Sequence, residues 1–151
     1  ANYNVAMGWQ ALGSNTTASS NTAVGYQAGY SNTTGAGHVY LGYQSGYSST
    51  TAGDPNVSIG YQAFYSNTTG NSNVAIGRDA LRSNTTASNN TAVGYQAGYS
   101  NTTLGANTFF GTQAGYSSTG SYNSCFGYQA GYGITTGTNN TFVGKIGRAH
   151  V

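Results

Sequence analysis

Apolar residues alternate with other residues in a short pattern that recurs along almost the whole chain. A glycine marks each copy, and an apolar residue always precedes the glycine directly. Two positions before that apolar residue stands Val, Thr or Ser. Alternation with a period of two and β-branched residues is typical of a β-strand. The pattern therefore predicts one short strand per copy. We expect its two alternating side chains, such as Val74 and Ile76, to point into a core.

The spacing of these glycines gives the length of the repeat. Successive glycines lie 17, 17, 18, 17, 17, 17, 16 and 17 residues apart, and an Asn, replaced once by His38, stands four residues before each. Such a period is typical of a solenoid, in which each copy forms one turn and packs only on its neighbours. We expect the glycine to turn the chain at a corner, where φ is positive or two backbones approach closely. The corner glycines are Gly8, Gly25, Gly42, Gly60, Gly77, Gly94, Gly111, Gly127 and Gly144.

The rest of the repeat is small or polar. Four of the eight intact copies continue from the corner with Tyr-Gln-Ala and the others with close variants, and the small third residue predicts a narrow interior. Ser-Asn-Thr-Thr then predicts a turn, and the one inserted residue, beside Asp54 and Pro55, fits a loop. Turns stacked at about 4.8 Å would form a rod roughly 40 Å long. The sequence thus predicts an all-β fold, a parallel β-solenoid of about eight to nine 17-residue turns, with residues 1–144 as one domain.

Composition narrows the possible partners. Only 4% of the 151 residues are charged, and 4 basic and 2 acidic residues give a net charge of +2. This is far too little positive charge for a nucleic-acid interface, and no apolar run is long enough to span a membrane. We expect no nucleic-acid partner and no membrane insertion by this segment. The one cysteine, Cys125, excludes an internal disulfide framework and fits a small packed strand residue.

The repeat does not explain where the sequence begins or how it ends. Ala1 stands in the middle of a copy, and residues 145–151 match the translation of a common short-read sequencing adapter. We therefore expect residues 145–151 not to be native, and residues 1–144 to be a fragment of a longer protein. A genuine C-terminal tail is the alternative.

The strand motif resembles that of a known family. Asn73-Val74-Ala75-Ile76-Gly77 and Asn56-Val57-Ser58-Ile59-Gly60 are similar to the head repeats of YadA-type trimeric autotransporter adhesins. The longer copies, with Gly-Tyr-Gln-Ala and Tyr-Ser-Asn-Thr-Thr, are similar to repeat arrays of phage tail fibres. The resemblance implies a left-handed β-roll assembled as a homotrimer. It also implies a location outside the cell, on a cell surface or on a virion, and a role in attachment to cells, through a glycan or a protein receptor.

Tyrosines form the candidate ligand surface. One set directly follows the corner glycine, and the other lies four residues later. Both sets change to arginine in one copy, at Arg78 and Arg82, which indicates that both are at least partly exposed. The rings could contact sugars, or they could stack on one another, cover the rod or line a contact between chains. The candidates are Tyr26, Tyr30, Tyr43, Tyr47, Tyr61, Tyr65, Tyr95, Tyr99, Tyr128 and Tyr132.

Two polar rows accompany the tyrosines. A Gln follows most of the first tyrosines, with Asp79 in one copy, and stacked Gln amides can hydrogen-bond along the axis of a solenoid. Thr-Thr pairs, such as Thr33-Thr34, also recur. An outward Thr row would suit ice binding, which is the main alternative function, although Thr-Thr after Ser-Asn also fits a turn. A spacer without any ligand is the third possibility.

Motifs for catalysis or cofactors are absent from the sequence. No nucleophile–base pair, phosphate loop or dinucleotide fingerprint is found, and Asp54 and Asp79 lie in different copies. His38 stands alone in an Asn position and has no companion with metal-ligand spacing. We therefore expect no enzyme activity, no cofactor and no metal.

Overall fold

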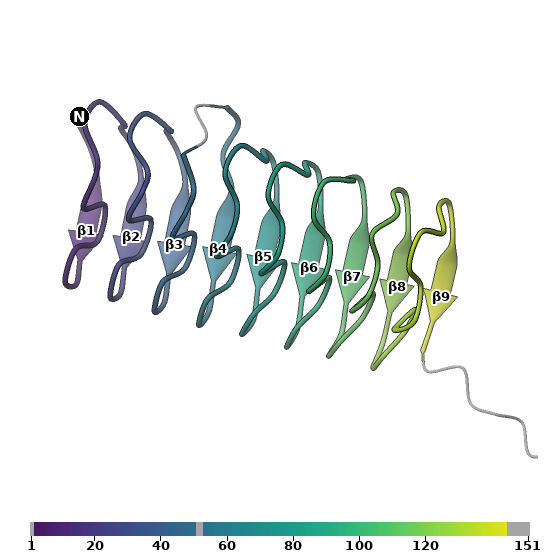
Figure 1. Ribbon diagram of the computed structural model, residues 1–151. Helices are drawn as coiled ribbons and strands as arrows, with labels where there is room; N and C mark the ends of the chain where they lie inside the picture. Colours follow the sequence, from purple (N-terminus) through teal and green to yellow (C-terminus); the bar gives the residue numbers. More distant parts are fainter. Residues whose placement is uncertain (1, 51–52, 145–151) are drawn as a thin grey trace, which may run out of the picture.

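The computed structural model describes residues 2–50 and 53–144, and these fold into nine short parallel strands. Residues 145–151, for which the sequence predicts an adapter origin, lie outside the described residues. Figure 1 shows the strands side by side in chain order, each followed by a loop that leads to the next. The strands are β1 (Val5–Met7), β2 (Thr22–Val24), β3 (Val39–Leu41), β4 (Val57–Ile59), β5 (Val74–Ile76), β6 (Thr91–Val93), β7 (Thr108–Phe110), β8 (Ser124–Phe126) and β9 (Thr141–Val143).

Each strand pairs in parallel with the same positions of the next repeat. Val74 of β5 pairs with Thr91 of β6, and Ile76 pairs with Val93. Because the pairing is in register with the repeat, the one inserted and the one missing residue fall in the loops and leave every pair intact. The predicted all-β parallel solenoid of about eight turns is confirmed.

The side chains of the strands face the opposite way from the prediction. The middle residue of β2 to β8 is fully buried, for example Ala75, whereas Val74 and Ile76 on either side of it point outward and are only half-buried. The expectation that the β-branched residues fill a core is therefore wrong. The reason is the width of the interior, because the small residue after the corner, such as Ala80, is itself buried and faces the strand. Little room is left between them for two branched side chains per turn.

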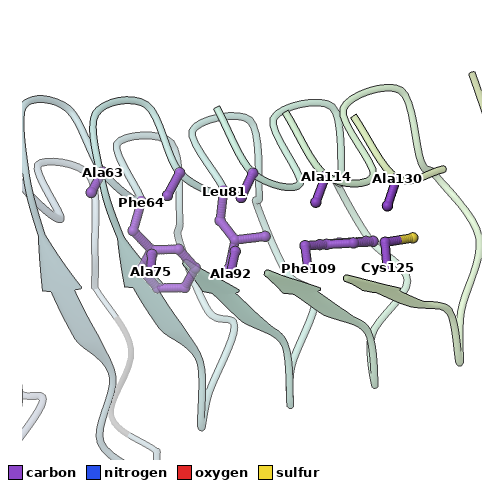
Figure 2. Packing of buried hydrophobic residues seen from close by; sticks show 11 residues of the cluster. Ala63, Phe64, Ala75, Leu81, Ala92, Phe109, Ala114, Cys125 and Ala130 are labelled. Atoms are coloured by element: carbon purple, nitrogen blue, oxygen red, sulfur yellow. The ribbon is translucent and has the colours of Figure 1, made fainter. Parts of the chain in front are cut away.

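The few large interior side chains come from two walls of the core, one formed by the strands and the other by the segments after the corner glycines. Tyr40 and Phe109 are middle residues of strands, whereas Phe64 and Leu81 lie four residues after the corner glycine. Figure 2 shows Phe64, Leu81 and Phe109. Where a strand supplies the ring, the opposite wall has glycine. A Cβ atom added to Gly115 would lie 2.2 Å from the ring of Phe109. The third, fourth, fifth and seventh turns thus each supply one large side chain from one wall, whereas the second and sixth turns have only Ala and Gly at these positions.

A buried asparagine ladder closes the turns on one another. The Oδ1 atom of Asn90 accepts a hydrogen bond from the backbone N–H of Asn107 at 3.0 Å. In the next turn, Oδ1 of Asn107 accepts one from the backbone N–H of Asn123 at 2.9 Å. His38 keeps the ladder intact, because its Nδ1 atom accepts the backbone N–H of Asn56 at 2.9 Å. Buried backbone donors need such partners. The Asn that marks each repeat in the sequence is therefore a structural element.

Candidate functional site

Over the first four turns, the first set of tyrosines forms a continuous stack with Trp9. The ring centroids of Trp9, Tyr26, Tyr43 and Tyr61 follow one another at 4.9, 5.1 and 5.0 Å, with planes inclined by 17°, 8° and 8°. The backbone repeat sets this distance, since adjacent strands lie about 4.8 Å apart. We call this stack the corner ladder, because each ring follows a corner glycine. Tyr95 and Tyr128 occupy the same position in later turns.

The second set of tyrosines stacks in the same way. Tyr30, Tyr47 and Tyr65 follow one another at 5.3 and 5.2 Å, and Tyr99, Tyr116 and Tyr132 follow at 5.1 and 5.0 Å. We call this stack the side ladder.

Stacking decides which part of each ring is accessible. Tyr26, Tyr43 and Tyr61 are 40 to 46% exposed, but their faces contact the rings of adjacent turns. The exposed part is therefore the ring edge and the hydroxyl group. The ladders offer a regular row of hydrogen-bonding hydroxyls, whereas a sugar could stack on a ring face only where a ladder is interrupted.

A glutamine ladder runs beside the corner ladder. The Nε2 atom of Gln27 donates to Oε1 of Gln10 at 2.9 Å, and Gln44 donates to Gln27 at 3.0 Å. Both Gln27 and Gln44 have positive φ, at 52° and 51°. The predicted amide bonding along the axis is confirmed, and it holds the backbone at the corner in a conformation that non-glycine residues rarely adopt.

The fifth turn replaces both ladders with charged residues. Arg78 and Arg82 take the two tyrosine positions, and Asp79 takes the glutamine position between them. The Nε atom of each arginine lies 3.3 Å from a different oxygen of the Asp79 carboxylate. These are three of the four charged residues in the part of the chain that the structure describes.

The outer face of the sheet is a second extended surface. Its two columns consist of the outward side chains of the nine strands, and none of these positions carries a charge. The column next to the corner glycines is entirely apolar, and the other consists of Val, Thr and one Ser. The members are Val5, Met7, Thr22, Val24, Val39, Leu41, Val57, Ile59, Val74, Ile76, Thr91, Val93, Thr108, Phe110, Ser124, Phe126, Thr141 and Val143.

The Thr-Thr row makes hydrogen bonds within the solenoid. The Oγ1 atom of Thr16 donates to the carbonyl of Thr33 at 3.0 Å, and Thr68 bonds Thr85 in the same way at 3.0 Å. The first hydroxyl of these pairs is thus engaged by the next turn, as in a turn stabilised by side chains. This arrangement gives ice binding no specific support.

Cys125 lies in the core rather than at a site. It is fully buried in the middle of β8, and burial raises the pKa of its thiol to about 11. At neutral pH the thiol is therefore protonated and unreactive. In residues 2–50 and 53–144 no three His, Cys, Asp or Glu side chains gather closely enough to hold a metal ion.

Comparison with known proteins adds no relative. No protein-family model, curated protein or solved structure matches the chain. No helix among the described residues is long and apolar enough to cross a membrane.

Proposed function

We propose that this chain is a rigid segment of an adhesive fibre, which assembles as a homotrimer and presents its tyrosine ladders for attachment. The fibre would stand outside the cell, on a cell surface or on a virion. The observation that carries the proposal is the outer face of the sheet, which is uncharged along all nine strands and has one entirely apolar column.

The occupant of that face is best explained as further copies of the same chain. Soluble monomers rarely expose a contiguous apolar patch larger than a few hundred Å². The two columns span nine strands, so at about 4.8 Å per strand they extend over roughly 40 Å. Parallel copies of this chain repeat side chains at the same spacing, so the rows of each copy match those of the others. No like charges oppose one another in such a contact, and permanent interfaces are hydrophobic in this way.

The narrow interior makes the same contact favourable for stability. Most buried apolar residues are Ala, and the large ones are only Leu12, Tyr40, Phe64, Leu81 and Phe109. A single turn therefore buries little apolar surface of its own. Burying side chains such as Ile59, Ile76 and Val93 against other chains would supply the missing hydrophobic stabilisation, at about 25 cal/mol per Å².

Attachment is assigned to the corner ladder, which stays accessible beside the sheet face. We expect the triple variant Tyr26→Ala, Tyr43→Ala, Tyr61→Ala to lose most binding to those neutral sugars on a printed glycan array that the unchanged chain binds. The hydroxyls and ring edges that would contact sugars are removed, while the asparagine ladder and the core are untouched.

The matched control changes three exposed threonines of the turns to alanine: Thr34→Ala, Thr69→Ala and Thr86→Ala. It should bind like the unchanged chain. Far-UV circular dichroism of both variants checks that the fold survives. Equal array binding by the tyrosine variant, or no glycan bound by the unchanged chain, would remove the attachment role and favour a spacer without a ligand.

A further inference from the structure

The fifth turn departs from the repeat at three linked positions. Every other intact turn has Gln where Asp79 stands, and within residues 2–50 and 53–144 no other turn places a charge in either tyrosine ladder. Thr112 shows that an uncharged residue also interrupts the corner ladder. Interruption alone therefore does not require an arginine. The three changes together form one charged cluster, Arg78–Asp79–Arg82.

Both guanidinium groups are held in place by the flanking turns. The Cζ atom of Arg78 lies 5.3 Å from the ring centroid of Tyr61 and 6.0 Å from that of Tyr95. Arg82 is held similarly in the side ladder, at 5.4 and 6.0 Å from the neighbouring rings. Cations over aromatic faces are stabilised, and the stacking restricts their side-chain motion before any ligand arrives.

The hydrogen bonds leave donors available on the exposed side. The carboxylate of Asp79, which is only 7% exposed, forms ion pairs with the Nε atoms of both arginines. Arg82 also donates to the amide oxygen of Gln62 and to the hydroxyl of Tyr99. Among the described residues, no hydrogen bond occupies the terminal amino groups of Arg78, whose side chain is 64% exposed. Two cations and one carboxylate give the cluster a net charge of +1.

We propose that this cluster binds the carboxylate of an acidic sugar, with Arg78 as the main contact and Arg82 as the second. A guanidinium presents paired N–H donors that match the two oxygens of a carboxylate. The hydroxyls of Tyr61 and Tyr95 lie on either side along the corner ladder and would bond the sugar hydroxyls. The inference rests on the proposed attachment function, because it names the ligand class of one turn on the same surface.

The test compares two forms of one saccharide by isothermal titration calorimetry. The probes are oligogalacturonate, in which every sugar carries a carboxylate, and its methyl ester, in which the charge is removed. We expect the full chain to bind the acid at least about tenfold more tightly than the ester, and this preference to shrink as salt is raised.

The chain itself supplies the control variant. The triple variant Arg78→Tyr, Asp79→Gln, Arg82→Tyr has the same residues at these positions as the sixth turn, which carries Tyr95, Gln96 and Tyr99. The variant should therefore fold. It is expected to bind acid and ester equally. An unchanged preference in this variant, or no preference in the unchanged chain, would overturn the acidic-sugar site. If the unchanged chain bound no neutral sugar on the array, the attachment function of the ladder would fail, and the preference for acid over ester would still be measurable.

Discussion

Replacing Gly94 with alanine is expected to unfold the central turns of the solenoid. Gly94 has φ of +139°, and an added Cβ atom would lie 2.4 Å from the carbonyl oxygen of Gly111 in the next turn. The two backbone segments cannot easily separate, because the Gly94 N–H donates to the carbonyl of Ile76 and the Gly111 N–H donates to the carbonyl of Val93, both at 2.8 Å. We expect a loss of about 4 kcal/mol or more in the free energy of unfolding. Urea denaturation followed by circular dichroism measures it.

Gly133→Ala is the matched control for this change. Gly133 has ordinary φ, and an added Cβ atom would meet nothing within 4 Å. The substitution should therefore change the free energy of unfolding by no more than about 1 kcal/mol, with stabilisation as the expected direction. If Gly94→Ala were as mild as Gly133→Ala, the close stacking of the corners would be contradicted.

The second large effect concerns the exchange of core side chains between the two walls. Phe109→Ala leaves a hole at a fully buried ring and should destabilise the solenoid by about 3–5 kcal/mol. Gly115→Leu alone should also destabilise it, because the new Cβ atom would overlap the ring of Phe109. The double variant, however, reproduces the fifth turn, where Ala75 faces Leu81. Leu81 has φ of +47° and Gly115 has φ of +58°, so a leucine fits the backbone there.

We expect the double variant to be more stable than either single variant. A double-mutant cycle in urea would then give a favourable coupling of about 2 kcal/mol or more. Additive losses would mean that the two walls do not compensate for each other.

The period of the sequence was sufficient to predict the path of the chain but not the direction of its side chains. Gly spacing and β-branched alternation correctly predicted nine strands in one parallel stack, because the period of a solenoid is written directly in its sequence. The same alternation fits either face of a strand. Assigning Val74 and Ile76 to the core assumed that apolar side chains point inward, which fails when the interior is narrow.

Other features depend on contacts between turns. The inward position of Ala80 was predicted from its constant small size, and the stacking of Gln27 on Gln10 from its repetition. The exchange between Phe109 and Leu81 could not be predicted, since it requires knowing that two positions of different turns share one space. The sequence showed only that an Asn recurs four residues before each corner glycine. It did not predict the buried ladder, because exposed asparagines would recur with the same spacing.

Sedimentation equilibrium of the full chain tests the self-assembly of the sheet face most directly. We predict a species of three times the 15.4 kDa chain mass. Ile76→Glu, which places a charge in the middle of the outer face, should give single chains, because an unpaired carboxylate cannot be buried there without a large cost. Thr86→Glu, on an exposed turn, should stay trimeric. A single-chain mass for the unchanged protein, or a trimer that tolerates Ile76→Glu, would contradict the account.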